Sequence, residues 1–123
     1  QLAVRDLSGV WNEKSASLIG ARPESNRDGV LQDVHWALGY FGYFPTYTLG
    51  SLYAAQLAET YARAKPLDEE IRKGQFGGLL QFLRTNVHRI GSRVSAEEIV
   101  AKATGTGLDS AAFFRYLETK RAG

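Results

Sequence analysis

Cysteine and methionine are both absent from the 123 residues of the sequence. Without cysteine there is neither a disulfide framework nor a thiolate metal site. We therefore expect a cytoplasmic protein, although the absence also fits any compartment in which disulfides are not needed. The chain begins at Gln1, inside a segment already patterned as a helix. Together with the missing methionine, this start predicts a piece of a longer protein.

Long apolar runs and strong charge are also missing. No run approaches the ~18 apolar residues that span a bilayer, and the first residues lack a signal-peptide pattern, so we expect no membrane partner. A net charge of +2 and a pI near 9.0 are too weakly basic for the cationic surface of a nucleic-acid binder. We expect no nucleic-acid partner, and a single domain over residues 1–123 with no internal boundary.

Strand patterns are lacking too, because no segment alternates apolar and polar residues over a strand's length. Apolar residues recur instead at helical spacing, and the fold class expected is all-α. Asp6 is a candidate N-cap, Gly20 a candidate helix end, and Ser95 with Glu98 forms a capping-box pattern. The predicted helices cover residues 6–19, 28–38, 45–64, 67–73, 75–90 and 95–103, with a last helix capped by Asp109 or Ser110.

The segment from Gly29 to Gly50 is unusual in gathering one His, one Trp, three Tyr, two Phe and one Pro beside four glycines. If residues 28–38 form one helix, His35 shares a face with Gln32, while Asp33 points elsewhere. The Asp-x-His spacing then cannot chelate one ion. Gly39 and Gly42 interrupt the pattern, so we expect a backbone break over residues 39–44 and a new helix from Pro45 onward.

Familiar catalytic patterns are missing. The sequence has only two histidines, His35 and His88, and no HExxH pattern, so it cannot supply a familiar zinc site. It has no G-x-S-x-G nucleophile elbow, and residues 74–78, GQFGG, lack the lysine of a phosphate loop and predict a helix boundary. The basic residues alternate with core positions and predict a solvated face; they are Arg84, His88, Arg89 and Arg93.

Three donors remain around the expected glycine break: His35, Tyr43 and Tyr47. An imidazole on one helix, followed by tyrosines at the start of the next, can aim several hydrogen-bond donors at one cleft, where they stabilise an oxyanion. The alternative is structural, because a buried tyrosine commonly packs its ring in the core and leaves its hydroxyl at the surface. The residues alone leave both interpretations open.

Two strings carry a family resemblance: GVLQDVHW at residues 29–36 and FGYFPTYTLG at residues 41–50. They resemble the C-terminal part of the carboxypeptidase Taq family, the thermostable zinc metallocarboxypeptidases. The pattern G-x-x-Q-D-x-H-W is matched at every fixed position. The likeness extends from WNEK at Trp11 to FFRYLETK near the end, so it covers essentially the whole chain.

The resemblance implies the C-terminal helical segment of a larger, two-lobed, zincin-like enzyme that forms a homodimer. That enzyme removes C-terminal residues from peptides that have a free C-terminus, using a zinc-bound water activated by the HExxH glutamate. Its zinc ligands lie upstream, so no metal is expected on this chain. The resemblance further implies that His35, Tyr43 and Tyr47 donate to the substrate or the oxyanion. Three neighbours would position His35 or the substrate: Gln32, Asp33 and Trp36.

The chain on its own is then expected to be inactive and to expose an apolar face where the remainder of its own chain would pack. A reading from a different class is a stand-alone helical module that binds peptides or proteins without catalysis, with the aromatic segment as its surface or core. A third reading is a regulatory remnant of a peptidase that binds peptides without cutting them.

Overall fold

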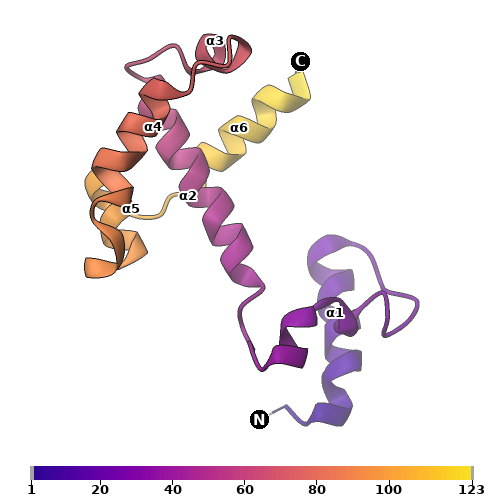
Figure 1. Cartoon of the computed structure of the whole chain (residues 1–123). Helices are drawn as coiled ribbons and strands as arrows, with labels where there is room; N and C mark the ends of the chain where they lie inside the picture. The colour runs from indigo at the N-terminus through magenta and orange to yellow at the C-terminus, as the bar shows by residue number, and fades with distance from the viewer. Residues whose placement is uncertain (1, 123) are drawn as a thin grey trace. The chain divides into compact units, whose positions relative to one another are not determined.

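The computed structural model describes residues 2–122, and these form helices joined by loops, with no strand (Figure 1). The all-α prediction is therefore confirmed. Contacts cluster the chain into two compact units, one ending at Pro45 and the other starting at Thr46, which we describe separately. That the chain is one domain without an internal boundary stays a prediction. Within the described residues, no helix has both the length and the apolar character needed to cross a membrane.

The first unit opens with α1, Leu7–Ile19, which follows a short 3-10 turn at Val4–Asp6. Gly20 ends the helix in the left-handed conformation, at φ 76°, as predicted. The prediction that Asp6 caps α1 through its side chain is wrong. Asp6 has helical backbone angles and its side chain makes no capping hydrogen bond, because the preceding turn already runs into the helix. A capping side chain needs an extended backbone at that position.

The single helix predicted over residues 28–38 is also wrong. The segment forms two 3-10 turns, Val30–Gln32 and Val34–Leu38, separated by Asp33 at φ −79° and ψ 80°. The Asp33 carboxylate accepts the backbone N–H of His35 at 3.3 Å and so starts the second turn. Aspartate commonly competes with regular helix in this way, because its short side chain offers the backbone another acceptor.

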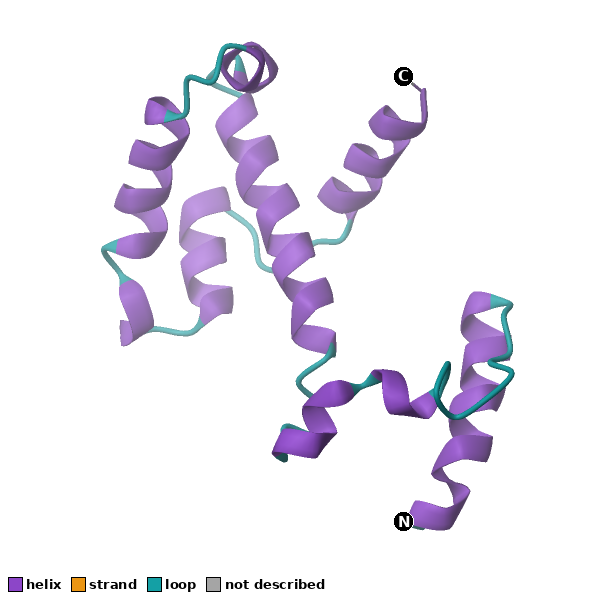
Figure 2. Cartoon of the chain, turned by 45° about the vertical axis from the view of Figure 1, so that its right-hand side comes forward, coloured by secondary structure: helices purple, strands orange, loops and turns teal. Residues whose placement is uncertain are grey.

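The second unit is built from five α-helices, which Figure 2 shows linked by short loops. The predicted helices in this region are confirmed, with ends shifted by a few residues. One helix differs in kind. Helix α4 starts at Gly77, inside the GQFGG segment, and continues into a π-helix at Arg84–His88, which a 3-10 turn at Gly91–Arg93 follows. The five are α2 Pro45–Ala62, α3 Leu67–Arg72, α4 Gly77–Leu83, α5 Ala96–Thr104 and α6 Ala111–Ala122.

Both predicted caps in this unit are present. At the start of α5 the Ser95 hydroxyl accepts the Glu98 N–H at 3.2 Å, and Glu98 Oε2 accepts the Ser95 N–H at 2.9 Å, which completes the capping box. The Ser95 hydroxyl also donates to Glu98 Oε2 at 2.8 Å, and the hydrogen bonds from the Ser95 N–H and hydroxyl lower the pKa of the Glu98 carboxyl. At the start of α6 Asp109 Oδ1 accepts the N–H of Ala111 at 2.9 Å.

Polar side chains, one of them buried, join the helices of the second unit. Gln56, 4% exposed, donates to the Gly107 carbonyl and accepts from the Asp109 N–H, both at 2.9 Å, so one amide connects α2 to the loop before α6. Arg115 of α6 donates to both carboxylate oxygens of Glu59 at 2.7 and 2.9 Å. That hydrogen bonding, from the Arg115 guanidinium, holds the pKa of Glu59 below its ordinary value.

Tyr61 links three helices of the same unit. Its ring is 4% exposed and lies 5.6 Å from the ring of Phe82, and its hydroxyl donates to Glu70 Oε2 at 2.8 Å. Burial and this hydrogen bond raise the pKa of the phenol. The Tyr61 hydroxyl sits against Gly78, where a Cβ would overlap it. A glycine on α4 therefore lets the helix approach α2.

Large apolar side chains are exposed on many elements, as predicted for a chain whose apolar surface would pack against the remainder of a longer protein. The most exposed are Val4 at 89%, Leu18 at 79% and Ile19 at 78%. Only four hydrophobic residues in the described chain are buried, namely Val30, Tyr61, Val100 and Ala112. The predicted apolar exposure is confirmed. Such surfaces commonly mark contact sites or drive association.

Candidate functional site

The centre of the candidate site is a paired aspartate and histidine in the first unit. His35 Nδ1 lies 2.8 Å from Asp33 Oδ1, and both side chains are largely buried, at 15% and 7% exposure. The same carboxylate oxygen also accepts the backbone N–H of His35. The expectation that Asp33 points away from His35 is wrong, because the two lie in a 3-10 turn rather than on a helix.

Two aromatic rings pack on the imidazole. The centroid of Tyr43 lies 4.9 Å from that of His35, and the Phe44 ring meets the imidazole edge to face at 5.5 Å. The chain returns to His35 because Gly39 and Gly42 both adopt left-handed angles, at φ 78° and 77°, and bend it between the turn and α2.

Sequence reasoning named Tyr43 but missed Phe44, because an apolar side chain offers no hydrogen bond to suggest a role. Tyr47, the third predicted donor, belongs to the second unit. It lies on the first turn of α2 and is 59% exposed, and its carbonyl accepts from the Ser51 hydroxyl at 3.1 Å. The structure therefore gathers three side chains of the first unit around the imidazole of His35, namely Asp33, Tyr43 and Phe44.

The other two predicted positioning residues make different contacts. Gln32 donates from its side-chain amide to the Arg27 carbonyl at 2.6 Å, which ties the motif to the preceding loop. Trp36 meets Trp11 of α1 edge to face at 6.1 Å and stacks on Phe41 at 5.8 Å. Their roles toward His35 or a substrate stay predictions, whereas Asp33 contacts His35 directly.

The first residue of the motif, Gly29, lies where two backbone segments come close. It is buried, and a Cβ there would lie 3.0 Å from Pro23 Cβ and 3.2 Å from the Ser25 carbonyl oxygen. Real Cβ atoms rarely approach other atoms so closely. Glycine at this position therefore lets the loop before the motif fold back onto it.

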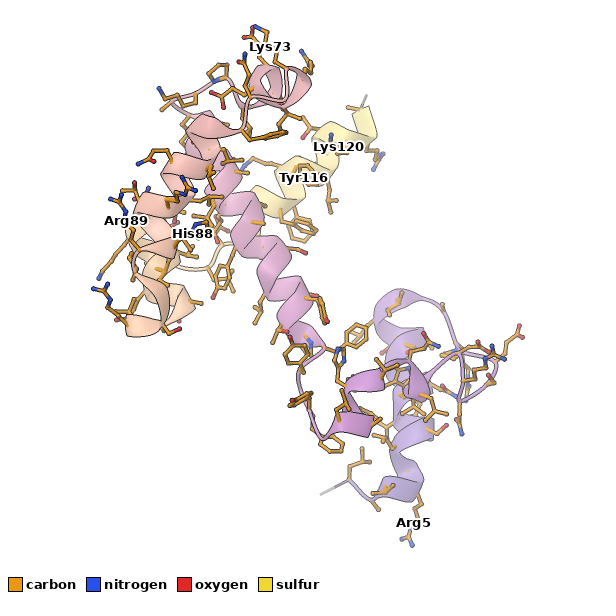
Figure 3. The ribbon with its side chains drawn as sticks, viewed as in Figure 1. Arg5, Lys73, His88, Arg89, Tyr116 and Lys120 are labelled. Atoms are coloured by element: carbon orange, nitrogen blue, oxygen red, sulfur yellow. The ribbon has the colours of Figure 1, made fainter. Side chains whose placement is uncertain are left out.

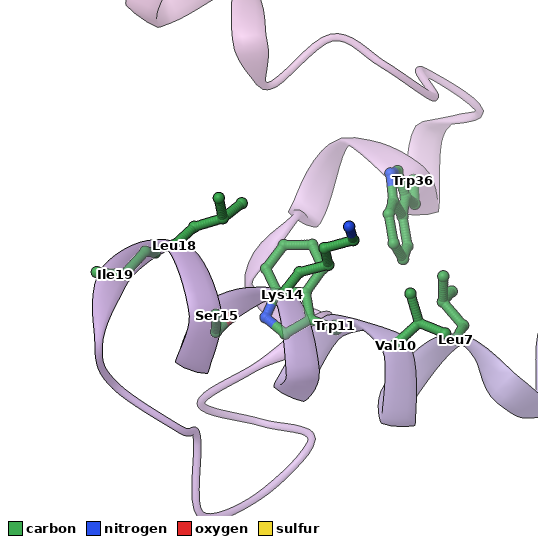
Figure 4. A pocket seen from close by; sticks show the side chains of 8 residues that line it. All are labelled: Leu7, Val10, Trp11, Lys14, Ser15, Leu18, Ile19 and Trp36. Atoms are coloured by element: carbon green, nitrogen blue, oxygen red, sulfur yellow. The ribbon is translucent and has the colours of Figure 1, made fainter.

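An apolar groove lies beside the site in the same unit (Figure 4). It encloses about 280 Å³ between one side of α1 and Trp36, with Lys14 and Ser15 as its polar members. Trp36 follows His35 directly in sequence and lines this groove. The aliphatic and aromatic lining comes from Leu7, Val10, Trp11, Leu18, Ile19 and Trp36.

The basic face predicted for the second unit is confirmed as exposed. Figure 3 labels two of its members, His88 and Arg89. All four of its side chains lie at the surface, and Arg93 donates to the Arg89 carbonyl at 3.2 Å.

Residues 2–122 contain no group of three or more His, Asp or Glu side chains that could hold a metal ion. The pair at the site supplies only two groups of ligand type, Asp33 and His35, and these bond to each other. A catalytic zinc site needs three protein ligands and an open position. The residues that the structure describes therefore do not fit a catalytic zinc site.

The chain is similar to known proteins over nearly its whole length. The family model described as carboxypeptidase Taq (M32) metallopeptidase matches residues 1–121. The chain belongs to the carboxypeptidase Taq family. The resemblance drawn from the two motifs is confirmed.

Relatives in this family are named carboxypeptidases. Thermostable carboxypeptidase 1 of Thermus thermophilus is 43% identical over 123 residues, and carboxypeptidase 1 of Bacillus subtilis is 40% identical over 121. These alignments cover 99% and 98% of this chain but 24% of each relative. The chain thus spans about a quarter of the length of the curated relatives it matches.

Solved structures agree with the fold. Metallocarboxypeptidase 1 of Trypanosoma cruzi aligns with a TM-score of 0.86 at 36% identity, over 99% of this chain and 26% of that one. A carboxypeptidase of this family from Deinococcus radiodurans aligns with a TM-score of 0.82 at 38% identity, over 97% of this chain and 24% of that one. The helices described above are therefore those of the family's fold.

Proposed function

We propose that this chain is the C-terminal part of a zinc metallocarboxypeptidase and contributes substrate-facing hydrogen-bond donors to its active site. The observation that carries the proposal is the buried Asp33–His35 pair, packed against Tyr43, in a chain that belongs to a metallocarboxypeptidase family. Its substrates are peptides with a free C-terminus. The reaction is hydrolysis of the last peptide bond.

In this proposal His35 donates to the substrate or to the oxyanion that develops on the carbonyl under attack. Asp33 holds the imidazole, and Tyr43 and Tyr47 assist as further donors. A preorganised donor of this kind is worth ~3 kcal/mol of transition-state stabilisation. Gln32 and Trp36 act at a distance from the reacting atoms, by fixing the turn that carries His35 to the preceding loop and to α1.

The metal and the wider assembly belong to the same proposal. Because the residues described here do not fit a zinc site, we place the zinc ligands and the HExxH base upstream, in the remainder of the protein's own chain. The intact protein is then a two-lobed, cytoplasmic homodimer. The exposed apolar surface of this chain, including the groove beside Trp36, supports packing against that remainder.

The decisive test is the substitution His35→Ala in the protein that carries the zinc ligands. Turnover should fall by about two to three orders of magnitude, since removing one oxyanion donor typically costs that much. Zinc content should stay nearly unchanged, and the melting temperature should fall only modestly, because Asp33 loses its hydrogen-bond partner. Rates are measured by release of the C-terminal residue from a blocked dipeptide.

His88→Ala is the matched control, because it removes the other histidine from an exposed position. This control variant should keep normal turnover. Normal turnover in His35→Ala would remove His35 from the mechanism. The isolated 123-residue chain, with or without added Zn²⁺, should release no C-terminal residue.

A second candidate is a stand-alone helical module that binds peptides or proteins without catalysis. The apolar groove on α1 and the exposed rings of Tyr40 and Phe41 favour it. An open reading frame that starts at or just before Gln1 would select this candidate over the enzyme. Titration of the chain with peptides bearing a free C-terminus would then separate a peptide-binding remnant from a module for folded partners.

A further inference from the structure

We propose that Asp33 fixes the neutral His35 imidazole in the tautomer that carries its proton on Nδ1. As a result, Nε2 donates a hydrogen bond only when the ring is an imidazolium. Asp33 is then a positioning residue that acts through the histidine. The assignment of the tautomer follows from the geometry of this chain, whereas the role of this tautomer in catalysis rests on the function proposed above.

The contact between His35 Nδ1 and Asp33 Oδ1 shows which atom donates and which accepts. An ionised carboxylate can only accept hydrogen bonds, so at 2.8 Å from Asp33 Oδ1 the Nδ1 atom must be the donor. The same oxygen accepts the His35 backbone N–H at 3.3 Å, so one carboxylate holds both the ring and the backbone of one residue. Asp33 is only 7% exposed, which limits competition from water.

Packing keeps the ring in this orientation. Tyr43 and Phe44 lie against it at centroid distances of 4.9 and 5.5 Å. Two of the groups in contact with the imidazole are titratable. They are the Asp33 carboxyl, from the residue between the two turns, and the Tyr43 phenol, from the segment that follows them. A ring flip would exchange Nδ1 for a carbon and lose the hydrogen bond.

The consequence concerns the second nitrogen. A neutral imidazole has one donor and one acceptor nitrogen, so a proton held on Nδ1 leaves a lone pair on Nε2. Whatever group meets Nε2 therefore meets an acceptor when the ring is neutral and an N–H when it is protonated. For His35 to stabilise an oxyanion through Nε2, it must enter the step doubly protonated.

The experiment is a long-range ¹⁵N–¹H NMR spectrum of the ¹⁵N-labelled 123-residue chain, recorded through a pH titration. It reports which ring nitrogen of each histidine is protonated. The chain has only two histidines, and the variant His88→Gln assigns them by removing one set of peaks. At high pH we expect His35 to show a protonated Nδ1 and an unprotonated Nε2. At low pH both nitrogens should be protonated.

The variant Asp33→Asn tests the cause. Its amide can turn a donor toward the ring, so the Nδ1–H preference should weaken and a population with the proton on Nε2 should appear, while His88 stays unchanged. A wild-type His35 that is neutral with its proton on Nε2 would overturn the proposal. The wild-type spectrum alone gives this result, so it does not depend on whether a variant folds. An unchanged His35 tautomer in a folded Asp33→Asn chain would also overturn it.

These spectra are independent of peptide hydrolysis. If the tautomer is found but His35→Ala keeps normal turnover in the zinc-bearing protein, the assignment of the proton stands and the catalytic role fails. If His35→Ala abolishes turnover but the proton lies on Nε2, the catalytic role stands and the positioning by Asp33 fails.

Discussion

Single residues decide the geometry of the candidate site, and Asp33 is the clearest case. Its carboxylate breaks the run of residues 28–38 into two 3-10 turns and then accepts from the side chain that the second turn carries. A regular helix would separate the two groups, because positions i and i+2 do not face each other. The local break is therefore what creates the pair.

Gly29 gives a prediction at this scale. Gly29→Ala should lower the free energy of unfolding by about 1–3 kcal/mol, because the added methyl group presses on Pro23 and on the Ser25 carbonyl in a tight, buried turn. Urea unfolding followed by circular dichroism measures the change. Gly9→Ala, on α1 with nothing within 4 Å of the new Cβ, is the control and should be neutral or stabilising by about 0.5–1 kcal/mol. Equal stability of the two variants would contradict the close approach at Gly29.

At the scale of elements, the packing of helix α4 against α2 and α3 depends on a glycine at the contact. Gly78, the second residue of α4, leaves room for the Tyr61 hydroxyl, which donates a hydrogen bond to Glu70 of α3. The adjacent Gly77 has open space where a side chain would stand. Of these two neighbouring glycines, only Gly78 is required by a close contact.

This contrast makes a matched pair of variants. Gly78→Ala should lose about 1–3 kcal/mol of stability, because the Tyr61 hydroxyl must move and its hydrogen bond to Glu70 weakens. Gly77→Ala should lose nothing and gain up to about 1 kcal/mol from the reduced freedom of the unfolded chain. Thermal unfolding of the three chains in parallel provides the measurement. A Gly78→Ala chain as stable as Gly77→Ala would show that Tyr61 can shift at little cost.

Sequence patterns predicted elements better than they predicted the site. The apolar spacing that indicates α2 and the Ser95–Glu98 capping box both rest on regular repeats, so they could be recognised without coordinates. The π-helix at Arg84–His88 has no such signature, because Leu83, Val87 and Ile90 keep ordinary α-helical spacing in the sequence through it. The helical pattern placed Asp33 away from His35, because their pairing depends on a backbone angle that propensities do not encode; only the family resemblance put Asp33 among the residues that position His35.

For the molecule as a whole, the unusual property is how little apolar surface is buried. Leu18 and Ile19 at the end of α1 are both more than three-quarters exposed, at 79% and 78%. Leu18 also lines the groove with Trp36. In a longer protein this surface would be covered. In the isolated chain it faces water, which favours association.

We therefore expect the isolated chain to self-associate as its concentration rises, and Leu18→Glu to weaken this association by placing a charge in the groove. Stability should change by no more than about 0.5 kcal/mol, because the side chain is exposed. Sedimentation velocity over a range of concentrations measures the effect. Ser92→Glu, at an exposed polar position, adds the same charge elsewhere and should associate like the wild type. A wild-type chain that stays monomeric at every concentration would contradict the expectation.

The contact between Trp11 and Trp36 has a practical consequence. The sequence has only two tryptophans, and they meet edge to face at 6.1 Å within the first unit. The second unit contains tyrosines but no tryptophan. Indole fluorescence of the natural chain therefore reports on the unit that carries His35 and on no other part. Loosening of the candidate site can be observed optically, without any label, while far-ultraviolet signals follow the helices of the whole chain.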